Sequence, residues 1–202
     1  MVSAREFLKA FHDQWEDDLA RNRPALLNAI AGAPTWTAYM LRGERAFLKR
    51  VADRLNRVMV VERDRIDASY YDTQAVPDFY PDWWQPYPAR WDVLIEHENG
   101  EYPQEELYKL LMRRAPLKVV IFYDWGEFAK EGLPRRHRWF PETLEDLFRI
   151  GRTVAAHWPE AENTEYLLLV GQPEQEGGHY TWRYLCVQGG SWPEQPGQLQ
   201  PL

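Results

Sequence analysis

The chain has little cysteine and no long apolar run. Its 202 residues include one cysteine, Cys186, which excludes an internal disulfide and favours a reducing compartment. No apolar run approaches the ~20 residues of a membrane span, and the amino terminus lacks the apolar centre of a signal peptide. We therefore expect a cytoplasmic protein without a membrane partner, in which Cys186 is a buried strand residue.

Basic charge is also scarce. The chain has 24 Lys and Arg against 31 Asp and Glu, a net charge of -7. A protein that grips polyanions over its whole surface has the opposite balance, so any contact with nucleic acid must be local. The densest basic patch contains Arg135, Arg136 and Arg138. It could meet phosphates, and it is equally compatible with a solvated cluster of surface charge.

Several common catalytic signatures are missing as well. The chain contains no Walker-type phosphate loop, no GxGxxG, no GxSxG, no HExxH and no CxxC. Its five histidines have no spacing typical of zinc ligands.

The segment from Trp91 to Tyr123 organises the rest of the sequence. Alternating side chains from Trp91 to Glu98 predict a strand, and Asn99-Gly100 predicts a turn. The spacing of leucines predicts a short helix over 104–114, and the apolar run 117–123 predicts a strand covered on both faces. A strand, helix and strand form a right-handed crossover with parallel strands. We therefore expect an α/β fold with a central mixed sheet flanked by helices.

The remaining patterns predict one α/β domain over 1–188, because 202 residues suffice for one core. Amphipathic patterns predict a helical lead-in over 1–56, including one helix over 35–56 that Gly43 weakens. The core spans 57–188 and ends in a hairpin of strands at 166–170 and 182–187. The Pro-, Gly- and Gln-rich tail, 189–202, is expected to be disordered.

Acidic side chains near the end of the 91–98 strand carry the strongest chemical signal. Glu96 and Glu98 share one strand face, and carboxylates are rarely buried without a cation or a donor. They therefore indicate a metal or a basic partner, unless the sheet edge simply reaches solvent there. His97 faces the other way, and we expect it to be a hydrogen-bonded core histidine.

The order of these acids resembles the PD-(D/E)XK nuclease superfamily, which has the restriction-endonuclease-like fold. Ile66-Asp67 looks like the motif's Asp, and Glu96 looks like its second acid. Glu98 stands where the family commonly has Lys, so the chain is a variant with Glu-x-Glu. Glu44 would match the helix acid of many members, although a lone helix acid is usually only solvated. The resemblance covers about 35–123.

The resemblance implies a metal-dependent nuclease acting on DNA or RNA. Asp67 and Glu96, with Glu98 or Glu44, would bind Mg²⁺ or Mn²⁺. Lys109, on the predicted helix, could replace the missing motif Lys, although an ion pair with Glu105 or Glu106 explains it equally well. The phosphate backbone would be held by Arg135, Arg136 and Arg138, or by Arg63 and Arg65.

Two other interpretations remain open. Ten Trp and eleven Tyr are a heavy aromatic load, and many lie between Tyr70 and Trp91. This aromatic loop could bind a protein partner or form a homodimer, on a nuclease scaffold without catalysis, or it could simply anchor itself to the body. Its candidate contacts are Phe79, Tyr80, Trp83 and Trp84. Alternatively, Glu96 and Glu98 bind a cation for structure only.

Overall fold

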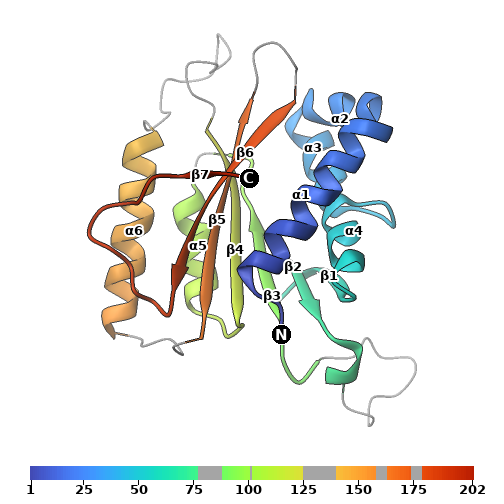
Figure 1. The fold of residues 1–202 in the computed structure, drawn as a ribbon. Coiled ribbons are helices and arrows are strands. Elements are labelled where there is room, and N and C mark those ends of the chain that lie inside the picture. Colours follow the sequence, from blue (N-terminus) through green and yellow to red (C-terminus); the bar gives the residue numbers. More distant parts are fainter. Residues whose placement is uncertain (77–87, 101, 125–139, 158–162, 174–178) are drawn as a thin grey trace.

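A mixed sheet with helices on both faces forms the protein (Figure 1). The seven strands in the described part of the chain follow one another across the sheet in sequence order. This arrangement confirms the expected α/β fold with a central sheet flanked by helices. Among the described residues, no helix combines the length and apolar character needed to cross a membrane. The computed structural model describes residues 1–76, 88–100, 102–124, 140–157, 163–173 and 179–202.

The helical lead-in covers one face of the sheet (Figure 1). Its first helix begins with a capping box, in which Ser3 and Glu6 bond each other's backbone amides, as the sequence predicts. Buried Asp18 accepts hydrogen bonds from Arg50, Tyr39 and Gln14, and it thereby joins three of the four helices. The helices are α1 (Ala4–Arg21), α2 (Arg23–Ile30), α3 (Ala33–Leu41) and α4 (Phe47–Arg54).

The expected single helix over 35–56 is wrong, because the structure has α3 and α4 in its place. The break contains Gly43, whose φ of 80° lies in the left-handed region that glycine adopts without steric cost. A continuous helix cannot pass through this conformation, so the chain turns and α4 takes a new direction.

A tight hairpin begins the sheet. Strands β1 (Val58–Arg63) and β2 (Ile66–Tyr71) are antiparallel, and Asp64 and Arg65 connect them with φ values of 56° and 66°. Two positive φ values are typical of the type I′ turn, whose twist matches that of paired strands. After a short 3₁₀ turn at Thr73–Ala75, β3 (Val93–His97) returns antiparallel to β2.

The centre of the sheet is built from parallel crossovers. Strands β3, β4 (Leu117–Tyr123) and β5 (Glu165–Pro173) are parallel, as expected for the first pair. Helices α5 (Pro103–Leu111) and α6 (Phe140–His157) connect them across the face opposite α1 to α4 (Figure 1). All seven residues of β4 are buried, because helices cover both of its sides.

The last strands form the predicted hairpin. β6 (Tyr180–Gln188) is antiparallel to β5, and β7 (Gln200–Pro201) pairs with β6 at Arg183 and Tyr184. Cys186 lies on a strand, as expected, but the expectation that it is buried is wrong, because Cys186 is exposed. Apolar neighbours on β6 alternate with it, so the apolar sequence around Cys186 says little about its own face.

The expectation of a disordered tail is also corrected by the structure. Trp192 is buried, with its ring 5.3 Å from that of Phe148 and 5.1 Å from that of Tyr166 between ring centroids. Arg152 donates to the carbonyls of Pro193 and Glu194 at 2.6 and 2.8 Å. One buried aromatic side chain and these bonds hold a segment whose composition alone is typical of disorder.

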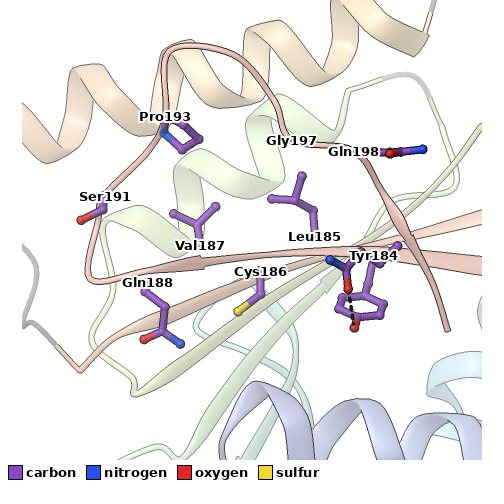
Figure 2. Close-up of a pocket in the computed structure, with 10 residues that line it drawn as sticks. Tyr184, Leu185, Cys186, Val187, Gln188, Ser191, Pro193, Gly197 and Gln198 are labelled. Carbon is purple, nitrogen blue, oxygen red and sulfur yellow. Dashed lines mark hydrogen bonds between the residues drawn. The ribbon is translucent and has the colours of Figure 1, made fainter.

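The tail and β6 enclose an open hollow of about 660 Å³ (Figure 2). Leu185 and Val187 point toward the arching segment between Ser191 and Gln198, whereas Cys186 points away from it (Figure 2). The amide of Leu202 closes the arch by donating to the carbonyl of Trp182 at 3.0 Å.

We expect Trp192→Ala to lower the free energy of unfolding by about 3–5 kcal/mol, because it removes a large buried side chain and leaves a cavity. Urea denaturation would measure the change. Gln198→Ala, in the same segment but exposed, is the control and should stay within about 0.5 kcal/mol of the wild type. Equal stability of the two variants would contradict the packing role of the tail.

Candidate functional site

Two acids predicted from the sequence lie side by side on adjacent strands. The register pairs Ala68 of β2 with Ile95 of β3, and one further step places Asp67 opposite Glu96. Directly opposed residues of an antiparallel pair share one face, here the face that α5 covers. The Asp67 carboxylate also accepts a hydrogen bond from the backbone amide of His97 at 2.8 Å. The structure thus brings together two of the acids that the sequence singled out.

Helix α5 places two further charged groups over this pair. Lys109 donates to the Glu106 carboxylate at 2.5 Å, three residues earlier on the same helix. This contact confirms the ion pair expected as the alternative role of Lys109. Glu106 also acts electrostatically on both Asp67 and Glu96, so it belongs to the cluster. The sequence placed Glu106 on the same helix side as Lys109, but only the packing of α5 shows that this side meets the acids.

Glu96 is the most constrained member of the cluster. Its side chain is 0% exposed, and among the described residues neither of its carboxyl oxygens has a hydrogen-bond partner. Burial, followed by the charges of Asp67 and Glu106, raises the pKa of Glu96 far above its ordinary value, and Lys109 opposes this only weakly. Glu96 therefore keeps its proton at neutral pH.

The neighbouring carboxyls titrate in the same direction. Burial raises the pKa of Asp67, and this outweighs the opposing hydrogen bond from the amide of His97. Burial likewise raises the pKa of Glu98. Glu98, however, turns back on its own chain, where its carboxylate accepts a hydrogen bond from the amide of Gly100. Glu98 therefore holds the turn after β3 while lying within electrostatic range of the acid pair.

The opposite face of β3 is closed by an aromatic network. His97 is buried, and its Nε2 lies 2.7 Å from the hydroxyl of Tyr123, which also accepts a hydrogen bond from the indole of Trp36. Burial lowers the pKa of His97 to about 3, so the ring is neutral. The expectation of a hydrogen-bonded core histidine is confirmed. The network fixes β3 from behind, and so it fixes the backbone that carries Glu96.

Glu44 does not join the other acids. It belongs to the connection between α3 and α4, in the helical layer on the other side of the sheet, and its side chain is 93% exposed. Its carboxylate lies 3.8 Å from the ammonium group of Lys49. The assignment of Glu44 as a metal ligand is corrected, because the break at Gly43 directs the residue to solvent.

Two sets of predicted residues fall outside the described residues. They are the basic patch with Arg135, Arg136 and Arg138, and the aromatic contacts Phe79, Tyr80, Trp83 and Trp84. Their roles stay predictions.

The cluster fits a cation in one respect and is incomplete in another. Two buried carboxyl oxygens of Glu96 that lack donors, beside Asp67, are the hard ligands that Mg²⁺ and Mn²⁺ prefer. As the side chains stand in the described part of the chain, no three His, Cys, Asp or Glu groups are close enough to hold a metal ion. Glu98 and Glu106 are the nearest further carboxyls, and each is engaged by a hydrogen bond, from Gly100 and Lys109 respectively.

Comparisons with protein-family models, with curated proteins and with solved structures find no match to this chain.

We expect the stability of the protein to fall as pH rises through the neutral range. The pKa of Glu96 in the unfolded chain is near its ordinary value of 4.5, and in the folded protein it is raised. Between these two pKa values the folded state keeps a proton that the unfolded state releases. The stabilisation is therefore complete below the unfolded pKa of 4.5 and is lost progressively as the pH rises toward the folded pKa.

Replacement of the acid by its amide tests this linkage. Glu96→Gln should raise the free energy of unfolding at pH 8 by about 1 kcal/mol or more, because the amide is neutral and can donate to the adjacent carboxylates. Thermal melts at pH 5 and pH 8 in EDTA would measure it, with exposed Glu105→Gln on α5 as the matched control. A pH profile identical to that of the wild type would show that Glu96 is not the group responsible.

Proposed function

We propose that the protein is a metal-dependent nuclease that hydrolyses phosphodiester bonds in DNA or RNA. One observation carries the proposal, namely the pair Asp67 and Glu96, which face each other across β2 and β3 beneath α5. This is the order and placement of acids that the resemblance to the PD-(D/E)XK superfamily leads us to expect. Burial of two acids together is costly unless it serves a purpose, since each raises the proton affinity of the other.

Asp67 and Glu96 would hold Mg²⁺ or Mn²⁺ in place of the proton on Glu96, with Glu98, which follows β3, as a further oxygen ligand. A bound divalent cation would polarise the scissile phosphate and acidify an attacking water. The His97 amide orients the Asp67 carboxylate from the side, so this ligand is held in position before anything binds.

Lys109 and Glu106 provide the remaining chemistry. Burial lowers the pKa of Lys109, but the carboxylates of Glu106, Glu96 and Asp67 raise it by more. The Lys109 Nζ therefore stays protonated at neutral pH and can donate to a phosphate oxygen or orient a water. Glu106 accepts a hydrogen bond from Lys109 and can receive a proton from a water held beside it. Lys109 would thus carry out, from the helix, the work of the motif Lys that Glu98 replaces.

Calorimetric titration with Mn²⁺, followed by cleavage assays on single-stranded and double-stranded DNA and RNA, tests the proposal. We expect saturable binding by the wild type. Asp67→Asn and Glu96→Gln keep the side-chain shape but remove a charged ligand, so they should weaken binding by at least about tenfold and abolish cleavage. Glu105→Gln is the control for loss of one carboxylate on exposed α5 surface. Absence of binding and cleavage in the wild type would refute the proposal.

A further inference from the structure

Exposed aromatic side chains gather on the helix that covers the acid pair. In the described part of the chain, the exposed large apolar side chains include Tyr102, Tyr108 and Met112, which lie on α5 or directly beside its ends. Tyr102 is 57% exposed and Tyr108 is 53% exposed. Single apolar side chains scattered over a surface need no explanation, whereas several on one surface element are typical of a contact site.

Tyr102 lies on the side of α5 that meets the acids. It is the residue immediately before the helix, four residues before Glu106 and seven before Lys109. Residues at these spacings share one side of a helix, so the three form a stripe, with about 6 Å of rise between Tyr102 and Glu106. The charge of Glu106 acts on both Asp67 and Glu96, which ties this stripe to the acid pair.

Tyr108 projects from a different side of the same helix. It follows Glu106 by two residues, and each residue turns an α-helix by about 100°, so the two side chains lie about 200° apart. Tyr102 and Tyr108 are therefore matched in chemistry and exposure, but only Tyr102 is aligned with the residue that meets the acids.

No structural task accounts for the Tyr102 ring. Its side chain makes no capping hydrogen bond, although Tyr102 occupies the capping position of α5. Among the described residues, the side chain also has no other hydrogen-bond partner and no ring contact. The backbone carbonyl of Tyr102, in contrast, accepts a hydrogen bond from the amide of Glu105 at 3.1 Å. The main chain is thus held by the helix, while the ring is left exposed to stack on a flat group.

We propose that Tyr102 stacks on a nucleobase next to the phosphate that is cleaved, and that the substrate is therefore single-stranded DNA or RNA. Proteins hold single strands by this combination, with cationic groups on the backbone and aromatic rings on the bases. Lys109 supplies the cation on the same stripe, and its side chain is 42% exposed. The bases of a duplex are already paired and stacked on one another, so they are closed to the ring. The inference deepens the proposed function and rests on it for the phosphate held at the acids.

Binding of single and double strands by the full chain measures this contact. Fluorescence anisotropy would follow fluorescein-labelled oligothymidylate, alone and paired with oligoadenylate, in Ca²⁺ and in EDTA. Ca²⁺ takes the same oxygen ligands as Mg²⁺ with less strict geometry. The test variant is Tyr102→Ala, the conservative variant is Tyr102→Phe, and the matched control is Tyr108→Ala. Both tyrosines are exposed, so their replacement leaves no cavity.

We expect Tyr102→Ala to weaken single-strand binding by about fivefold to a hundredfold, which corresponds to the loss of one stacked base. Tyr102→Phe keeps the ring and Tyr108→Ala alters the other side of α5, so both should stay within about twofold of the wild type. The slope of log affinity against log salt should be the same in all variants, because none of them removes a charge.

Three results would overturn the inference. The first is equal affinity of Tyr102→Ala and the wild type for the single strand, or no binding of it by the wild type. The second is an equal loss in Tyr102→Ala and Tyr108→Ala. The third is tighter binding of the wild type to the duplex than to the single strand.

Mn²⁺ titration and cleavage assays separate failure of this inference from failure of the proposed function. Tyr102→Ala keeps every carboxylate, so it should bind Mn²⁺ as the wild type does and cleave single strands with a raised KM. Ring-dependent binding by a wild type that never cleaves would keep the stacking contact and refute the nuclease. Cleavage by Tyr102→Ala with an unchanged KM would keep the nuclease and refute the contact.

Discussion

The exclusion of water from β3 is the constraint on which the rest of the site depends. Helices cover both faces of this strand, and its parallel partner β4 is buried along its whole length. A carboxyl group placed there has no solvent to stabilise its charge, so Glu96 must keep a proton or meet a cation. The proton affinity of the cluster is thus a consequence of the layered fold, and any ligand that replaces the proton gains from the same exclusion of water.

The two faces of β3 have different tasks, which the alternation of side chains allows. Toward α3, the neutral ring of His97 joins Tyr123 and Trp36 in a buried, hydrogen-bonded aromatic network. Toward α5, Glu96 meets Asp67, Glu106 and Lys109. A rigid rear face positions the front face before binding, and reactive groups placed to within a fraction of an ångström need such support. Tyr102, immediately before α5, extends this front face with an exposed ring.

Local patterns predicted the elements near the site but not all of its members. Alternation and apolar spacing are properties of neighbouring residues, so the crossover and Asp67, Glu96 and Lys109 were placed correctly on their strands and helix. Glu44 was misplaced because one left-handed residue, Gly43, redirects the chain. Glu106 and Tyr102 were missed because their significance depends on which side of α5 meets the sheet. The tail was misjudged because one tryptophan outweighs its disorder-prone composition.

The sequence by itself determined the secondary structure of the centre, the parallel crossover and the presence of an acid, Glu96, on the buried part of one strand. The periodicity of the apolar residues and the turn residues decide these features, and both act over only a few residues. The tertiary structure decided which charges meet. The pairing of Asp67 with Glu96 depends on strand register, and the approach of Glu106 depends on helix packing. Electrostatic interactions act through space, so their partners are set only when distant segments pack together.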